Sequence, residues 1–70
     1  MNAKDTRNLV ELTGGNKAFA CELGIVTEPG YQQRINRWKH RGISAGCMWM
    51  YQRDIKRLAR KHGIRIVLVP

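Results

Sequence analysis

The sequence predicts a mainly α-helical fold of four helices followed by a short C-terminal β-strand. Apolar residues recur at intervals of three and four in successive segments, which is the pattern of helices with one buried face. Glycines follow these segments, where a left-handed backbone commonly ends a helix. The segment before the terminal proline is β-branched and apolar, as in a strand. A chain of 70 residues has room for a single domain, residues 1–70.

The first two predicted helices are short and end at glycines. The first covers Asp5–Leu12 and ends at Gly14-Gly15. The second covers Asn16–Leu23, with Asn16 as its N-cap. Gly24 fits the left-handed position that follows a helix end, so we expect the second helix to stop at Leu23.

A loop and a third helix come next. The Pro29-Gly30 pair favours a turn, which places a loop over Val26–Gly30. The third helix covers Tyr31–His40, because Tyr31, Ile35 and Trp38 lie at i, i+4 and i+7 and form one apolar stripe. The opposite side of this helix is polar and carries Gln32, Gln33, Asn36, Arg37 and His40.

The fourth predicted helix is the longest and covers Ala45–His62. Ser44 is its candidate N-cap and Gly63 ends it. One side carries Met48, Tyr51, Ile55, Leu58 and His62, and the other carries Arg53, Lys56, Arg57 and Arg60. Trp49 falls by spacing among the basic residues. We expect its indole to tuck under the start of the helix, and the alternative is an indole exposed for a partner.

The predicted strand, residues 64–69, has no second β-rich segment to pair with in the chain. An unpaired strand edge favours association with another chain, so we expect an antiparallel ribbon between two identical tails in a homodimer. The alternative is a tail that packs as an extended segment across its own helices. The dimer contacts would come from Ile64, Ile66, Val67, Leu68 and Val69.

Positive charge is concentrated in the second half of the chain. Residues 34–70 hold ten basic residues and one acidic residue, a net charge of +9, whereas residues 1–33 hold three basic and four acidic residues, a net charge of −1. A one-sided field of this kind attracts polyanions, of which nucleic acid is the commonest in a cytosol. The alternatives are a protein that is merely basic, an anionic membrane surface, or an acidic protein partner.

Little in the sequence supports enzymatic chemistry. Cys21, Cys47, His40 and His62 show no metal-ligand spacing, so we expect no metal and no cofactor. A nucleophile, a base and an orienting group cannot be assembled around the one serine, so the chain is predicted not to be an enzyme. No signal-peptide pattern and no apolar run of membrane-spanning length are present, which predicts a cytoplasmic protein with reduced thiols.

Three short motifs carry a resemblance to a known family. They are Gly15-Asn16-Lys17-Ala18-Phe19-Ala20 with Leu23-Gly24-Ile25, then Ile35-Asn36-Arg37-Trp38-Lys39, and then Arg41-Gly42-Ile43-Ser44. Together they resemble the helix-turn-helix of Cro-like phage repressors. The resemblance implies a small helix-turn-helix domain that binds specific double-stranded DNA and regulates transcription in the cytoplasm of a bacterial host. Gly24 lies eleven positions before Ile35, farther than in that family, so an insertion over Val26–Gly30 lengthens the turn or the start of the third helix.

The third helix carries the candidate base-reading residues. Gln and Asn can bond adenine through two hydrogen bonds, and Arg can bond guanine in the same way, when a helix lies in the major groove. These chemistries share one helical face, so an ordinary solvated face is the alternative. The base-reading candidates are Gln32, Gln33, Asn36, Arg37 and His40.

Other polar residues are candidates for phosphate contacts. Asn16 and Lys17 begin the second helix, where the family geometry and the free backbone N–H groups favour a phosphate. Arg53, Lys56, Arg57 and Arg60 either contribute in part or form a solvated face. The remaining phosphate candidates are Tyr31, Arg34, Lys39 and Arg41.

Two further functions stay open at this point. A small phage-encoded inhibitor or antitoxin could reuse the same fold to bind a protein. A protein that binds RNA, or any nucleic acid without sequence preference, would show the same charge.

Overall fold

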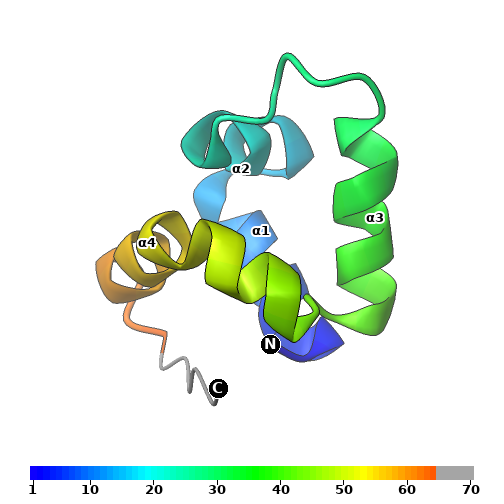
Figure 1. The fold of residues 1–70 in the computed structure, drawn as a ribbon. Coiled ribbons are helices and arrows are strands. Elements are labelled where there is room, and N and C mark those ends of the chain that lie inside the picture. Colours follow the sequence, from blue (N-terminus) through cyan, green and yellow to red (C-terminus); the bar gives the residue numbers. More distant parts are fainter. Residues whose placement is uncertain (65–70) are drawn as a thin grey trace.

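Four helices make up the computed structural model, which describes residues 1–64 (Figure 1). They are α1 (Ala3–Thr13), α2 (Asn16–Leu23), α3 (Tyr31–Arg41) and α4 (Ala45–Lys61). The mainly helical fold class is therefore confirmed. No strand occurs within residues 1–64, and Ile64 has no regular structure. The rest of the predicted strand, with Ile66, Val67, Leu68 and Val69, lies outside the described residues.

Helix α1 begins two residues earlier than the sequence pattern predicted. The reason is a cap outside the apolar repeat: the side-chain oxygen of Asn2 accepts a hydrogen bond from the backbone N–H of Asp5 at 2.7 Å. The hydroxyl of Thr6 donates to the Asn2 carbonyl at 2.7 Å, which satisfies the polar group of a fully buried side chain. Asn2 and Thr6 thus fix the start of α1 together.

Helix α2 has the predicted bounds, but its N-cap is different. Gly15 occupies the cap position at φ 104°, where no side chain bonds the free N–H groups. Asn16 is the first residue of the helix, and the prediction that it caps α2 is wrong because glycine takes the preceding open conformation. At the other end Gly24 is left-handed at φ 75°, as predicted.

Seven residues, 24–30, connect α2 to α3, so the segment Val26–Gly30 belongs to this connection and not to α3. Ile25 is buried, and its N–H donates to the Ala20 carbonyl at 3.0 Å, which closes the end of α2. A further turn forms where the N–H of Glu28 donates to the Ile25 carbonyl at 2.9 Å. Figure 1 shows this connection passing over the molecule from α2 to the start of α3.

The core forms where α2, α3 and α4 all pack against α1. Trp38 lies between two rings in edge-on contact, with its centroid 6.5 Å from Phe19 and 6.0 Å from Tyr51. The indole therefore connects α3 to both α2 and α4. The other large buried side chains are Leu9, Val10, Leu23, Ile25, Ile35, Ile43, Met48, Ile55 and Leu58.

The start of α4 exposes Trp49 instead of covering it. Ser44 is the N-cap, as predicted, and its hydroxyl accepts from the N–H of Cys47 at 3.3 Å. Met48 is buried and Tyr51 is half-buried, so these two residues, three positions apart, occupy the side of this turn that faces the core. Trp49, one position after Met48, is turned about 100° away from the core. Trp49 is 73% exposed, so the expectation that its indole tucks under the helix is wrong.

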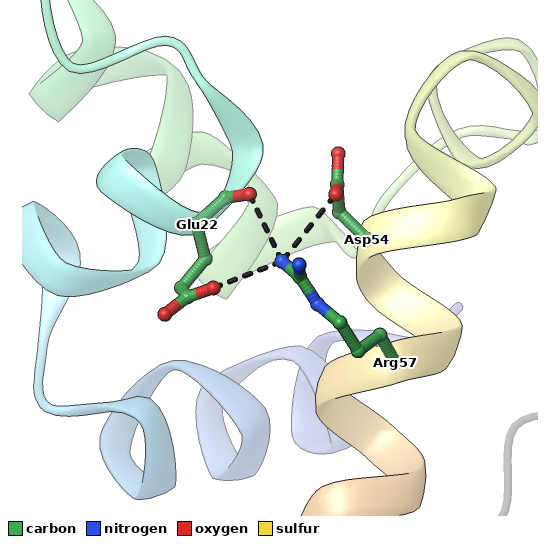
Figure 2. A network of polar contacts seen from close by, with 3 residues as sticks. All are labelled: Glu22, Asp54 and Arg57. Carbon is green, nitrogen blue, oxygen red and sulfur yellow. Dashed lines mark hydrogen bonds and ion pairs between the residues drawn. The ribbon is translucent and has the colours of Figure 1, made fainter.

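An arginine of α4 bridges to the end of α2 (Figure 2). The Arg57 guanidinium lies 2.9 Å from a carboxylate oxygen of Glu22 and donates to the carbonyl of the same residue at 3.3 Å. It also lies 3.4 Å from a carboxylate oxygen of Asp54, one turn earlier on α4. Two acidic side chains therefore surround the charge of Arg57, which sets it apart from its basic neighbours on α4.

The chain start lies against the link between α3 and α4. The N–H of Ile43 donates to the Met1 carbonyl at 2.9 Å, and the terminal amine of Met1 donates to the Ile43 carbonyl at 3.2 Å. Gly42, at φ 86°, ends α3 beside this pair, and a Cβ there would overlap the carbonyl oxygen of Met1. Only glycine fits this crossing without a shift of the backbone.

Candidate nucleic-acid interface

Helix α3 lies along one edge of the molecule in the view of Figure 1. Only Ile35 and Trp38 of its eleven residues are buried. The helix has no acidic residue and carries four basic ones, Arg34, Arg37, Lys39 and Arg41. All five predicted base-reading residues are exposed on it: Gln32, Gln33, Asn36, Arg37 and His40. The structure thus brings the candidates together on one helix and divides them into two groups.

The first group is bonded to Asn16, and we call Gln32, Asn36 and Lys39 the Asn16-bound stripe. The carboxamide nitrogen of Asn16 donates to the side-chain oxygens of Gln32 at 3.1 Å and Asn36 at 2.9 Å. Its carboxamide oxygen accepts from the Lys39 ammonium at 3.2 Å. These residues lie at i, i+4 and i+7, so one side chain at the start of α2 spans two turns of α3. Their polar atoms are partly occupied within the protein.

The second group is the outer stripe, Gln33, Arg37 and His40, which also lies at i, i+4 and i+7. None of the hydrogen bonds or ion pairs found within residues 1–64 engages these three side chains. All three are exposed, and by helical spacing they lie on the side opposite Ile35 and Trp38. The outer stripe therefore presents an amide, a guanidinium and an imidazole whose hydrogen-bonding capacity is available to a ligand.

The phosphate candidates divide in the same way. Lys17 is exposed in the first turn of α2, where no side chain caps the backbone N–H groups. Arg41 is exposed at the end of α3. By contrast, Asn16 and Lys39 bond each other, and the Tyr31 hydroxyl accepts from the Gln32 amide at 3.2 Å. The structure thus leaves Lys17 and Arg41 with the most accessible polar groups.

Arg34 bonds groups within the protein. Its guanidinium donates to the Tyr51 hydroxyl at 3.2 Å and lies 3.7 Å from the Glu28 carboxylate. Tyr51 belongs to α4 and Glu28 to the connection before α3, so Arg34 links three parts of the chain. Its side chain is 42% exposed, which keeps the ion pair with Glu28 weak.

A groove separates the end of α3 from the start of α4. It has a volume of about 610 Å³, and three arginines of α3 line it: Arg34, Arg37 and Arg41. Its α4 side includes Ser44, Cys47, Met50 and Tyr51. Glu28 also lines the groove and lies 3.7 Å from Arg34, which leaves Arg37 and Arg41 as its cations without an acidic partner in residues 1–64. Arg37 belongs to both this groove and the outer stripe, so the two surfaces meet at Arg37.

Two contacts between helices at this interface were not predicted from the sequence. Asn16 organises one side of α3, and the guanidinium of Arg7 on α1 donates to the Lys39 carbonyl at 2.8 Å near the end of α3. Both contacts join residues more than fifteen positions apart in the chain. A local pattern cannot indicate them, because they depend on how α1, α2 and α3 pack.

Comparisons of the chain with protein-family models, with curated proteins and with solved structures found no match. Within residues 1–64, no helix combines the length and the apolar character that crossing a membrane requires. The same residues contain no cluster of three or more His, Cys, Asp or Glu side chains that could hold a metal ion.

Proposed function

We propose that the protein is a sequence-specific double-stranded DNA-binding regulator of transcription. In this proposal α2 and α3 form a helix-turn-helix with a lengthened turn, and α3 is the recognition helix. One observation carries it: the outer stripe presents Gln33, Arg37 and His40, exposed and without protein partners in the described part of the chain, on a helix that lacks acidic residues.

The chemistry of the outer stripe fits base edges in a major groove. The groove admits an α-helix, and long polar side chains on the outward side of that helix reach the bases. Arg37 can bond guanine and Gln33 can bond adenine, each through two hydrogen bonds. The two side chains lie one helical turn apart, about 6 Å along the axis, which corresponds to about two base-pair steps of B-DNA.

The Asn16-bound stripe supports this function indirectly. It holds the first turn of α2 against the middle of α3, so the two helices present their exposed groups in a fixed relation. Lys17 and the uncapped N–H groups of α2 can then contact a phosphate beside the groove that α3 enters. Arg41 can contact a second phosphate from the other end of α3. We include the homodimer in the proposal, with the tail as its interface, because two copies on a two-fold axis fit a palindromic site.

Salt dependence and competition test the proposal together. We expect the logarithm of the affinity for duplex DNA to fall with the logarithm of the salt concentration, with a slope of about −4 to −5 if about five phosphates are contacted. Fluorescence anisotropy of a labelled duplex measures this slope. A selected site should also compete better than random duplex at the same salt concentration. A slope near zero contradicts nucleic-acid binding, and equal competition contradicts sequence specificity.

A further inference from the structure

The groove between the end of α3 and the start of α4 has an apolar side that contacts with DNA do not explain. Met50 lines it and is 72% exposed. The buried residues Trp38 and Ile43 and the half-buried Tyr51 also line it. A large apolar side chain in contact with water gains free energy when a ligand covers it. The groove therefore offers an apolar surface that an apolar group can cover.

The α3 side of the same groove is cationic. Arg37 and Arg41 line it, both are exposed, and their positions at i and i+4 place them about 6 Å apart on α3. Neither guanidinium makes a hydrogen bond or an ion pair within residues 1–64. Arg34 differs, because it bonds the Tyr51 hydroxyl at 3.2 Å and lies 3.7 Å from the Glu28 carboxylate. Two unpaired guanidinium groups thus lie beside an apolar surface.

The size of the groove indicates a small ligand. Its volume of about 610 Å³ lies within the range of about 300–1,000 Å³ that is usual for small-molecule sites, which combine apolar lining with a few polar groups. Eleven of the described residues line it, whereas a protein partner usually covers about 20–30 residues. An inorganic anion would pair with the arginines but would leave Met50 uncovered. A small molecule with both an anionic and an apolar part uses the whole lining.

We propose that this groove binds a small organic anion whose charged group is bonded by Arg37 and Arg41 and whose apolar body lies against Met50 and Tyr51. Guanidinium groups donate paired hydrogen bonds to carboxylate, sulfonate and phosphate oxygens alike. Arg37 also belongs to the outer stripe, and it cannot bond a ligand and a guanine at the same time. The ligand therefore competes with duplex DNA. The binding site does not rest on the proposed function, whereas this competition does.

Two matched probes test the site on the full chain. Anilinonaphthalene sulfonate joins an anionic group to an apolar ring system, and its uncharged analogue phenylnaphthylamine has the same rings without the sulfonate. The fluorescence of both rises when the rings leave water. We expect the sulfonate to bind about 3- to 10-fold more tightly than the uncharged analogue, between the effect of an exposed ion pair and that of a charge-assisted hydrogen bond.

Two pairs of variants locate the bound probe. Met50→Ala should weaken binding of the sulfonate about 3- to 10-fold, because it removes apolar area that the rings cover. Trp49→Ala is its control, since Trp49 is 73% exposed but is not among the described lining residues. Arg41→Gln should weaken the sulfonate by a similar factor and leave the uncharged analogue unchanged. Its control is Arg60→Gln, an exposed arginine of α4 that lies outside the groove. Both controls should stay within about twofold of the parent chain.

Competition with DNA is measured by anisotropy of a labelled duplex. At about ten times its dissociation constant, the sulfonate should lower the affinity for the duplex about 5- to 10-fold. The uncharged analogue should lower it less at the same concentration. Met50→Ala should bind the duplex as the parent chain does, because Met50 belongs to no proposed DNA contact, but the sulfonate should displace the duplex from this variant less effectively.

Three outcomes overturn the proposal when circular dichroism shows every variant folded. The first is equal sulfonate binding by the parent chain, Met50→Ala and Arg41→Gln. The second is an equal loss of binding in Trp49→Ala and Arg60→Gln, which would show adsorption to any apolar or basic surface. The third is an unchanged duplex affinity with the sulfonate bound, which excludes the competition. Absence of duplex binding would instead contradict the proposed function, and the variant titrations would still decide whether the groove is a ligand site.

Discussion

The side-chain carboxamides of Asn16 and Asn36 bond each other at 2.9 Å, which ties the first turn of α2 to the middle of α3. This contact decides how the polar residues of α3 divide. Residues on the Asn16 side, Gln32 and Lys39 among them, share their hydrogen bonds with α2. Gln33 and Arg37 are turned farther from α2, and their side chains make no hydrogen bond within residues 1–64, so their polar groups are available to a ligand.

Removal of the Asn16 side chain should therefore loosen the contact between α2 and α3. We expect Asn16→Ala to lower the free energy of unfolding by about 0.5–1.5 kcal/mol, the usual net contribution of partly exposed hydrogen bonds. Urea unfolding followed by circular dichroism measures the change. Asn8→Ala is the matched control, because Asn8 is exposed on α1 and makes no side-chain hydrogen bond within residues 1–64. A stability of Asn16→Ala equal to that of the control contradicts a structural role for this contact.

Two glycines four residues apart should respond to alanine in opposite directions. Gly42 has φ 86° and faces the Met1 carbonyl, so Gly42→Ala should destabilise the fold by about 1–3 kcal/mol. Gly46 lies inside α4 in open space, so Gly46→Ala should stabilise it by about 0.5–1 kcal/mol. Thermal unfolding of both variants measures the difference, and the same sign of change in both would show that the Met1 contact does not constrain Gly42.

Deletion of the C-terminal tail tests the proposed homodimer. We expect deletion of residues 65–70 to shift the protein toward monomer in sedimentation, to preserve most of the helical signal, and to weaken DNA binding strongly. The reason is that a palindromic site needs two recognition helices about 34 Å apart, which one copy cannot supply. An unchanged assembly state after the deletion excludes the tail as the dimer interface.

Local sequence signals predicted the helices well. Ser44 caps α4 and Gly24 follows α2 as expected, because capping depends on residues within one turn of a helix end. Contacts between helices were not predictable in this way. Asn is a residue type that favours N-cap positions, yet Gly15 takes the N-cap position of α2 and the side chain of Asn16 forms hydrogen bonds with α3. The exposure of Trp49 likewise depends on which residues of α4 meet the core at that turn.

The candidate base-reading residues show the same limit. The sequence placed Gln32, Gln33, Asn36, Arg37 and His40 on one polar helix face, and all five are exposed there. The sequence could not predict which of the five bond Asn16, because the division into an Asn16-bound stripe and an outer stripe depends on how α2 packs against α3. Helical periodicity identifies the sides of a helix, whereas packing determines which neighbour each side meets.

The central claim is that the outer stripe of α3 contacts base edges. Its most direct test is the selection of duplexes from a random library. The parent chain should enrich a defined site. Gln33→Ala or Arg37→Ala should lose discrimination at one or two base pairs of that site, by about 1–3 kcal/mol each, while Lys17→Ala weakens binding to all duplexes alike. Failure of the parent chain to enrich any site, or an unchanged site in the combined Gln33→Ala, Arg37→Ala variant, would contradict the account.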